Sequence, residues 1–314
     1  MHRKDDPFID LSLPDKPIVN PLCSPDTISA LRRKHLFAFN KSLGQHFLIN
    51  PRIPYNIVRA SGVDGGMGVL EIGPGIGCLT FELAKQAARV VAVEIDGALL
   101  PVLQETLPFD NVFVVHADVM KLDLHDLFPK WFGNLPVAVV ANLPYYITTP
   151  IVMQLLENAP PLLQTVTVMV QLEVANRLCA PPGTPDSGAI SLAVDYYSRA
   201  RFLFKVPAAN FVPMPKVDSA IVRFDLRREP PVRVSDTKLM FELIKQGFGQ
   251  RRKTLVNAIG NQGVYPKTEL AQALDRMKLP PDIRAERMTL QQFAALTDIL
   301  TGGAPPRTAP PWGF

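Results

Sequence analysis

The stretch Glu71-Ile72-Gly73-Pro74-Gly75-Ile76-Gly77 decides the fold, because it joins an apolar run, residues 69–72, to a helical pattern over residues 79–88. Glycines in such a turn let the backbone approach a ligand closely, at the sheet edge where open α/β folds bind ligands. The dinucleotide fingerprint G-x-G-x-x-G fits poorly, since Cys78 stands three positions after Gly75. The turn therefore predicts a ligand site of another kind, with a tight connection that binds nothing as the alternative.

Outward from this turn, short β-branched runs alternate with helical patterns. The runs are residues 69–72, 90–93, 112–115, 137–140 and 166–170, and helical patterns cover residues 79–88, 98–107 and 151–156. This alternation is typical of βαβ units, so the sequence predicts an α/β, Rossmann-like domain with a mostly parallel sheet. Two later runs, residues 202–206 and 220–226, are expected to add strands at the end of that sheet.

The rest of the chain indicates a second domain and two tails. After residue 233 apolar residues recur with helical spacing, in groups at residues 239–244, 255–259, 270–274 and 293–300. The pattern alone therefore predicts an α/β domain over residues 25–233 and a small helical domain over residues 234–301. Proline-rich ends at residues 1–24 and 302–314 predict a mobile extension and a mobile tail.

Four polar residues fall at the ends of successive predicted strands. Glu71, Glu94, Asp118 and Asn142 are separated by 23, 24 and 24 residues, one βα unit per step. Side chains at the carboxyl ends of parallel strands share one sheet edge. A carboxylate at position 94 suits ribose hydroxyls, and one at position 118 suits an adenine amino group, so the set predicts a nucleoside site. A single strand-end acid is more often a helix cap.

The segment Asn142-Leu143-Pro144-Tyr145 is the candidate for chemistry. The Asn142 side-chain oxygen and the Pro144 carbonyl could accept hydrogens from an aromatic amine and so make its nitrogen a better nucleophile. Pro144 restricts the preceding residue to extended geometry, and the Tyr145 ring offers a face for stacking a base. An ordinary loop is the alternative for such a tetrapeptide.

Composition excludes several classes of protein. The chain has 314 residues, 47% hydrophobic and 20% charged, which is typical of a folded globular protein. Its three cysteines, Cys23, Cys78 and Cys179, have no disulfide or zinc spacing, and we expect no metal. The uncharged stretch 131–156 contains three prolines, so it is not expected to span a membrane, and no signal peptide is evident. The sequence predicts a cytoplasmic protein.

Two basic blocks flank an acidic middle. Residues 31–60 hold six basic residues and no acid, residues 91–160 hold eight acids and two lysines, and residues 199–253 hold thirteen basic and five acidic residues. This pattern favours a polyanionic partner that the two basic blocks bind on either side of a site with another role. A solvated surface of Lys and Arg explains the same charges equally well.

With these motifs in this order, the chain resembles the bacterial small-subunit (16S) ribosomal RNA adenine dimethyltransferases of the KsgA type. The resemblance runs from about residue 26 to residue 301. Its motifs are Lys41-Ser-Leu-Gly-Gln-His-Phe-Leu48, Glu71-Ile-Gly-Pro-Gly-Ile-Gly77, Val93-Glu94-Ile-Asp96, Ala117-Asp118, Asn142-Leu-Pro-Tyr145, Phe211-Val-Pro-Met-Pro-Lys-Val-Asp-Ser219 and Gln250-Arg-Arg-Lys-Thr254. The glycine turn is shared by many methyltransferases, whereas the combination is specific.

The resemblance implies an S-adenosylmethionine-dependent methyltransferase domain, followed by a helical domain, that dimethylates two neighbouring adenosines near the 3′ end of the RNA. It implies cofactor contacts from His46, Leu48, Gly73, Glu94, Asp118 and Asn142. It places Asn142, Pro144 and Tyr145 on the target amine, Phe211 on the flipped adenine, and Gln45 and Phe47 in the surrounding wall. The triplet Arg251, Arg252 and Lys253 lies in the second basic block, where contacts with RNA phosphates are expected. An exposed helix face without a ligand is the alternative.

Three positions depart from the family pattern. His46 stands where the family often has Asn, Leu172 replaces a usual Lys, and Ser187 replaces a usual Tyr. The first change keeps a hydrogen-bonding side chain, and the other two lie outside the cofactor and amine motifs.

The expected partner is small-subunit ribosomal RNA or an immature small subunit, bound by a monomer with no membrane contact and a part in ribosome biogenesis. Three alternatives remain open: a large-subunit rRNA dimethyltransferase of the macrolide-resistance type, a non-catalytic ribosome-assembly factor, and a dinucleotide oxidoreductase. The segments 211–219 and 250–254 favour the small-subunit enzyme over the first. The motif at residues 142–145 argues against the second.

Overall fold

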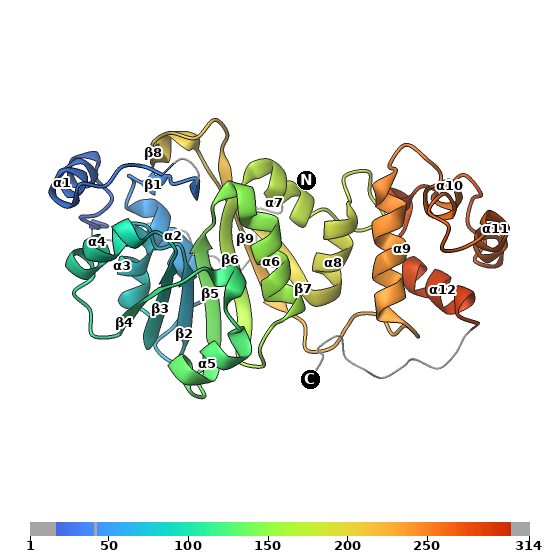
Figure 1. Ribbon diagram of the computed structural model, residues 1–314, viewed down its shortest axis with the longest axis horizontal. Helices are drawn as coiled ribbons and strands as arrows, with labels where there is room; N and C mark the ends of the chain where they lie inside the picture. Colours follow the sequence, from blue (N-terminus) through green and yellow to red (C-terminus); the bar gives the residue numbers. More distant parts are fainter. Residues whose placement is uncertain (1–16, 41–42, 303–314) are drawn as a thin grey trace. The chain divides into compact units, whose positions relative to one another are not determined.

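The computed structural model describes residues 17–40 and 43–302. Its centre is a seven-stranded sheet in the order β4-β3-β2-β5-β6-β9-β7 (Figure 1). The strands are β2 (Gly68–Ile72), β3 (Arg89–Glu94), β4 (Val112–His116), β5 (Val137–Asn142), β6 (Leu163–Gln171), β7 (Ser198–Val206) and β9 (Ser219–Leu226). The first five strands of the chain in this sheet pair in parallel, and β9 pairs with β6 in the antiparallel sense. The predicted α/β fold is confirmed, with the two later strands at the end of the sheet.

The central strands consist mostly of buried apolar residues. All residues of β2 are buried, as are all but the first of β3 and all but the last of β5. Helices α2 (Arg52–Ser61) and α3 (Cys78–Ala84) pack against each other, α2 also against β5 and β6, and α3 against β3. A continuous apolar strand is typical of a parallel sheet between helical layers.

Further helices of this part of the chain are α1 (Pro25–His35), α4 (Leu100–Thr106), α5 (Leu124–Phe132), α6 (Thr148–Glu157) and α7 (Leu172–Leu178). A separate two-stranded sheet pairs β1 (Phe47–Leu48) with β8 (Phe211–Val212) in the antiparallel sense. This pairing brings two of the sequence motifs side by side, although more than 160 residues separate them.

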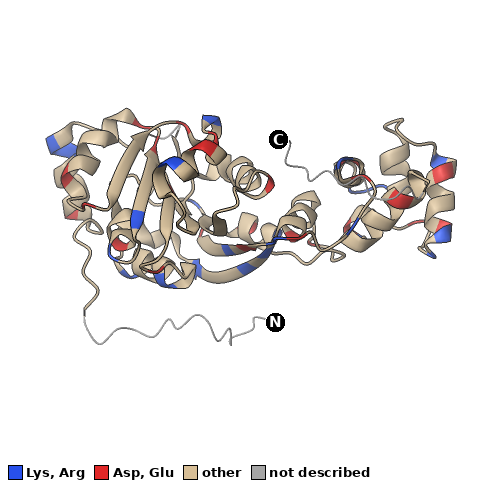
Figure 2. Cartoon of the chain, turned by 90° about the horizontal axis from the view of Figure 1, so that it is seen from below, with Lys and Arg blue, Asp and Glu red and all other residues tan. Residues whose placement is uncertain are grey.

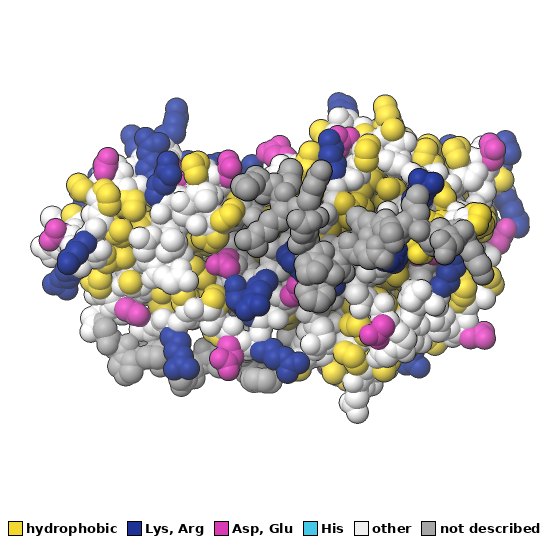
Figure 3. Space-filling view, turned by 180° about the vertical axis from the view of Figure 1, so that it is seen from behind, with side chains coloured by type: hydrophobic (Ala, Val, Ile, Leu, Met, Phe, Trp, Pro, Cys, Tyr) yellow, Lys and Arg dark blue, Asp and Glu magenta, His cyan; other side chains and the backbone are white. Residues whose placement is uncertain are grey.

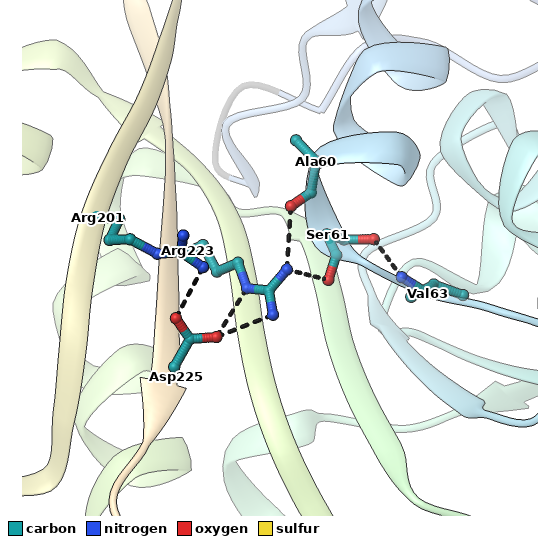
Figure 4. Close-up of polar contacts among 6 residues, drawn as sticks. All are labelled: Ala60, Ser61, Val63, Arg201, Arg223 and Asp225. Carbon is teal, nitrogen blue, oxygen red and sulfur yellow. Dashed lines mark hydrogen bonds and ion pairs between the residues drawn. The ribbon is translucent and has the colours of Figure 1, made fainter. Parts of the chain in front are cut away.

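Arg223 on β9 anchors the end of α2 (Figure 4). Its Nη1 donates to the carbonyls of Ser61, at 2.9 Å, and Ala60, at 3.3 Å. Its Nε donates to Asp225 at 2.9 Å, and Asp225 also accepts from Arg201 of β7 at 2.8 Å. The last carbonyls of a helix lack partners within the helix, so this guanidinium satisfies two of them and ties α2 to the sheet.

Residues 20–23 are packed against α3, although the sequence predicts a mobile extension over residues 1–24. The Asn20 side chain is 5% exposed, and its Nδ2 donates to the carbonyl of Cys78 and to Oε1 of Glu82, both at 2.9 Å. The prediction therefore differs from the structure over this short segment, because a single buried amide ties it down. Residues 1–16 lie outside the described residues, as do residues 303–314 of the predicted tail.

The chain divides into two compact units. The first comprises residues up to 175 together with residues 201–226, and the second comprises residues 176–200 together with residues from 227 onward. The second unit contains α8 (Ala189–Tyr197), α9 (Thr237–Gly249), α10 (Leu255–Gly260), α11 (Lys267–Arg276) and α12 (Leu290–Leu300). All four helical groups predicted after residue 233 are present. The division differs from the predicted boundary at residue 233, because α8 packs against α9 and α12.

The segment Gln250-Arg251-Arg252-Lys253-Thr254 is not helical, which corrects the prediction. α9 ends at Gly249, and α10 begins at Leu255 with Thr254 as its N-cap. The Thr254 hydroxyl accepts from the Asn257 backbone N–H at 3.4 Å. A threonine side chain that caps a following helix leaves the residues before it in an extended or turn conformation, so the basic triplet lies in the connection between two helices.

Several basic residues of the block 199–253 form ion pairs within the sheet. They lie along β7 and β9 (Figure 2), where Arg201 and Arg223 pair with Asp225, and Lys205 pairs with Asp218 at 2.7 Å. On the face in Figure 3, Lys and Arg side chains are interspersed with Asp and Glu. Part of the positive charge counted over residues 199–253 is therefore neutralised locally. No helix among the described residues is long and apolar enough to cross a membrane.

Candidate active site

A cavity opens at the carboxyl ends of β2, β3 and β5, where the sequence places its polar residues. It encloses about 820 Å³, open space at its mouth included. Its walls are formed by the glycine turn, by the residues at the strand ends and by residues 43–48. The lining residues are Leu43, Gly44, Gln45, His46, Phe47, Leu48, Glu71, Gly73, Pro74, Gly75, Ile76, Cys78, Leu79, Glu94, Ile95, Leu99, Asn142, Leu143, Pro144, Tyr145 and Tyr146. Lys41 and Ser42 of the first motif lie outside the described residues.

The glycine turn forms one wall of the cavity. Gly73, Gly75 and Gly77 have φ of 69°, 61° and 94°, a conformation that other residues adopt only at a cost. A Cβ on Gly75 would come within 2.9 Å of the Phe47 ring, so a side chain there would displace that wall. The N–H groups of the three glycines bond within the protein, to the Val93 carbonyl, Glu94 Oε2 and the Pro74 carbonyl, so the absence of side chains is what lets a ligand approach the turn closely.

Glu94 closes β3 and orders the floor of the cavity. It is 4% exposed, its Oε2 accepts from the Gly75 N–H at 3.2 Å, and its Oε1 accepts from the Asp96 N–H at 2.8 Å. Burial raises the pKa of Glu94, which its backbone hydrogen bonds oppose. Asp96 in turn accepts from Gln45 Nε2 at 2.7 Å, so residues 43–48 are tied to the end of β3.

Glu71, the first of the four strand-end polar residues, lies beside Glu94 in the same cavity. It is 1% exposed, and burial raises its pKa to about 8, opposed by the nearby Thr80 hydroxyl and supported by the Glu94 carboxylate. Among the described residues no group hydrogen-bonds to its Oε2. A buried carboxyl oxygen without a partner, aimed at a cavity, is a candidate contact for a ligand donor.

Asp118 lies in an adjoining recess and not in the main cavity. The recess is lined by Ile72, Gly73, Val93, Ile95, Ala117, Asp118, Val119, Met120, Pro144, Tyr146, Ile147 and Ile151. Gly73, Ile95, Pro144 and Tyr146 line both spaces. Oδ1 of Asp118 accepts from the Met120 N–H at 3.0 Å. Its Oδ2 lies 3.8 Å from the Lys121 ammonium. The apolar walls of the recess suit a flat ring with a polar edge toward Asp118.

Asn142 ends β5 and faces the segment of residues 43–48. Its Nδ2 donates to the His46 carbonyl at 3.4 Å, which leaves its Oδ1 to accept from a ligand. The Pro144 carbonyl already accepts from Thr148 Oγ1 at 3.0 Å and from the Ile147 N–H at 3.3 Å. Since a carbonyl oxygen has two lone pairs, Pro144 can accept from a target amine only if one of these bonds gives way.

The ring of Tyr145 packs against His46, with ring centroids 5.6 Å apart and planes 27° from parallel. His46 Nδ1 lies 2.6 Å from the Pro213 carbonyl and must donate to it, because a carbonyl only accepts. The structure thus connects the first, fifth and sixth motifs around one wall. Histidine at position 46 keeps a hydrogen bond there, consistent with the departure from the family pattern.

Phe211 does not line the cavity. It is 2% exposed, pairs with Leu48 between β8 and β1, and belongs to the hydrophobic core. The predicted stacking on an adenine therefore needs a movement that exposes the ring, and it stays a prediction. Sequence position alone gave no sign of this burial.

The basic triplet Arg251, Arg252 and Lys253 belongs to the second unit, and all three side chains are exposed. Arg251 Nη2 contacts the Pro185 carbonyl at 3.5 Å, close to Ser187, whose hydroxyl donates to the Glu286 carbonyl at 3.1 Å. Leu172 begins α7 and donates its N–H to the Asp218 carbonyl. Both departures thus occupy ordered positions. Within residues 17–40 and 43–302 no cluster of three or more His, Cys, Asp or Glu could hold a metal ion.

The sequence analysis gives no role to two residues at or next to the cavity, Tyr146 and Ser219. Tyr146 follows Tyr145 directly, so it could have been found by asking which neighbours share the sheet edge. Ser219 carried no such signal: it contacts Tyr145 from 74 residues away.

Comparison with known proteins shows the family of the chain. The model of the family "Ribosomal RNA adenine dimethylase" matches residues 36–301. The chain belongs to this family. Among curated members, ribosomal RNA small subunit methyltransferase A of Geobacillus thermodenitrificans is 44% identical over 89% of this chain and 97% of its own length. The protein of the same name from Bacillus licheniformis is 45% identical over 89% and 97%.

Solved structures agree with the rRNA adenine dimethylase fold. The 23S rRNA methyltransferase ErmE is 28% identical with a TM-score of 0.63, over 81% of this chain and 99% of its own. A dimethyladenosine transferase from Plasmodium falciparum, 24% identical, matches the fold with a TM-score of 0.68 over 82% and 98%. As a member of this family the chain is an rRNA adenine dimethyltransferase with a Rossmann-like domain and C-terminal helices.

Proposed function

We propose that this enzyme uses S-adenosylmethionine to dimethylate the exocyclic amines of two adjacent adenosines in the 3′-terminal hairpin of small-subunit rRNA. One observation carries the proposal: Asn142-Leu143-Pro144-Tyr145 lines the same cavity as Gly73 and Glu94. The amine-binding motif and the nucleoside-binding positions therefore share one space. The curated relatives that carry the small-subunit name, at 44% and 45% identity, support the choice of RNA.

The residues present fit S-adenosylmethionine. Buried Glu94 and the glycine turn offer a carboxylate and backbone groups to a ribose and a methionine chain, and the apolar recess beside Asp118 suits an adenine. The orphaned Oε2 of Glu71 can accept from a ligand ammonium. S-adenosylmethionine supplies a methyl group on a sulfonium sulfur, which leaves as a neutral thioether.

Asn142 acts on the target amine. Its Nδ2 is held by the His46 carbonyl, so its Oδ1 is fixed in the cavity and can accept one amine hydrogen. This contact orients the nitrogen lone pair toward the methyl carbon, and the amine proton passes to water after the transfer. Because the leaving group is neutral, rate arises mainly from positioning and electrostatics, without a strong base or a metal.

The Pro144 carbonyl is the predicted second acceptor for the amine, although it already accepts hydrogen bonds from the Thr148 hydroxyl and the Ile147 N–H. We propose that the Thr148 hydroxyl releases it when the amine binds, since that hydroxyl can turn to another acceptor. The Tyr145 ring provides the stacking face. The adenine must leave its base stack to reach this cavity, as for other enzymes that act on a base.

RNA binding is proposed to involve the exposed triplet 251–253 of the second unit, with phosphates as the contacts. The substrate is an immature small subunit or its RNA, which gives the enzyme a part in ribosome biogenesis and places it in the cytoplasm.

The test is transfer of labelled methyl groups from S-adenosylmethionine to unmethylated small-subunit particles and, in parallel, to large-subunit RNA. We expect dimethyladenosine in the small-subunit hairpin, reduced at least 100-fold by Asn142→Ala, because that change removes the amine acceptor. Asn158→Ala, an exposed asparagine after α6, is the matched control and should keep full activity.

The other outcomes separate the alternatives. Label in large-subunit RNA alone would assign the enzyme to the macrolide-resistance type, which the ErmE match at 28% identity keeps as the second candidate. Binding to particles without any label would leave an assembly factor. Equal activity of Asn142→Ala and Asn158→Ala would remove Asn142 from the chemistry.

A further inference from the structure

Ser219 is buried next to the proposed amine site and contacts that site through the side chain of Tyr145. It is 0% exposed, and its Oγ lies 2.8 Å from the hydroxyl oxygen of Tyr145. Either hydroxyl can donate. Burial raises the pKa of Tyr145, so the phenol keeps its proton near neutral pH and the hydrogen bond persists. Ser219 does not line the cavity, whereas Tyr145 does.

The position of Ser219 is fixed by the strand ladder that also fixes Asn142. Ser219 begins β9 and pairs with Gln171 at the end of β6, and Asn142 at the end of β5 pairs with Met169 of β6. Three adjacent strands therefore set the separation between Ser219 and Asn142. Tyr145 follows the end of β5 by three residues, and its hydroxyl is bonded to Ser219 of β9.

The segment before Ser219 is braced as well. The Asp218 carbonyl accepts from the Leu172 N–H at 3.0 Å, and its side chain accepts from the Ala208 N–H at 2.9 Å and pairs with Lys205 at 2.7 Å. A hydroxyl on a backbone anchored in this way is a rigid support. Support of this kind holds a functional side chain in its working rotamer.

We propose that Ser219 is a positioning residue for methyl transfer: its buried hydroxyl holds the Tyr145 ring at a fixed place beside Asn142, where the ring receives the target base. The inference rests on the proposed function. The inference adds to the proposed function a residue outside the cavity that acts only through Tyr145. Loss of one buried hydrogen bond lets the ring leave this place, and misplacement of a positioning group lowers the rate more than ligand binding.

The test is a double-mutant cycle with Ser219→Ala, Tyr145→Phe and both changes together. We expect each single variant to lower kcat about 10-fold and the double variant to be no slower than the slower single one, because both changes break the same bond. The dissociation constant for S-adenosylmethionine should stay within about twofold of the wild type, since Ser219 lines no part of the cavity.

Ser198→Ala is the matched control. Ser198 is also 0% exposed, and its Oγ donates to the Val194 carbonyl at 3.0 Å, but it belongs to the other unit. We expect it to lower the melting temperature about as much as Ser219→Ala while leaving kcat unchanged. If Ser219→Ala does not fold, Tyr145→Phe breaks the same bond from the exposed end, and its kcat decides.

Three results would overturn the inference: an unchanged kcat in both single variants, losses that multiply in the double variant, or weaker cofactor binding in proportion to the lost rate. Failure of the proposed function is recognised separately, because the wild-type enzyme would then transfer no label to small-subunit particles. An inactive Asn142→Ala with fully active Ser219→Ala and Tyr145→Phe would reject only the role of Ser219.

Discussion

At the scale of single residues, Glu71 shows how burial changes the chemistry of a carboxyl group. Its pKa of about 8, against a usual 4.5, means that the folded enzyme holds it protonated at neutral pH. The cause is desolvation, since water is excluded from a side chain that is 1% exposed. A neutral Glu71 beside Glu94 also avoids two adjacent negative charges in one cavity.

This protonation makes stability depend on pH in a defined direction. Between pH 4.5 and about 8 the folded chain holds one proton that the unfolded chain has lost, so the free energy of unfolding falls as pH rises, by about 1.4 kcal/mol per pH unit from this group. Glu71→Gln cannot ionise and should lose this contribution to the slope. Urea unfolding at pH 5, 6, 7 and 8 measures it.

Glu229→Gln, at an exposed position, is the control and should follow the wild-type pH dependence. Parallel pH curves for wild type and Glu71→Gln would show that Glu71 is ionised in the folded protein, contrary to the burial argument.

At the scale of elements, helix α3 is held from both sides. Its N-terminus continues the glycine turn, and its outer side is bonded to Asn20, whose Oδ1 also accepts from the Leu22 N–H at 3.1 Å. The segment of residues 20–23 therefore acts as a strap on the helix that begins at the cofactor cavity. Glu82, 5% exposed, depends on this strap and on Lys85, 3.0 Å away, for its hydrogen bonds.

Removing the strap contact should destabilise the enzyme. Asn20→Ala removes a buried donor to the Cys78 carbonyl and to Glu82 Oε1, which keeps only its bond from Lys85, and we expect a loss of about 1–3 kcal/mol in the free energy of unfolding. Urea unfolding at pH 7 gives this value. The exposed Asn158→Ala should change it by less than about 0.5 kcal/mol. A similar small change for both variants would mean that the strap adds nothing.

At the scale of the whole molecule, the sequence predicts what local periodicity encodes. The parallel strands and the shared edge of Glu71, Glu94, Asp118 and Asn142 follow from one βα unit of about 24 residues, and the cavity with its adjoining recess contains all four. Contacts between distant segments leave no such period. This is why the Ser219–Tyr145 bond, the burial of Phe211 and the packing of residues 20–23 were not predictable.

The second unit carries the proposed RNA contacts, and salt dependence tests them. Replacing Arg251, Arg252 and Lys253 by Ala should weaken RNA binding and reduce the slope of log K against log salt by about 2 to 3, because each phosphate contact releases a counterion. Filter binding between 50 and 200 mM salt, conditions chosen to span about a fourfold range, measures the slope.

The matched control removes three exposed charges elsewhere in the same unit, by Lys267→Ala, Arg276→Ala and Lys278→Ala on and after α11. It should change the slope less than the 251–253 variant. Equal slopes for the two triple variants would show that the unit attracts RNA by total charge alone and that the loop before α10 has no special role.

The second unit is assembled from two stretches of chain, residues 176–200 and residues from 227 onward, with β9 and most of β7 between them. A gene segment encoding only the later stretch would supply α9 to α12 without α8, the helix on which α9 and α12 pack. Recombination could therefore exchange this unit among methyltransferases only by moving two sheet strands with it. Ser219, which we propose positions the Tyr145 ring, lies on one of those strands, so such an exchange would also replace this support of the proposed amine site.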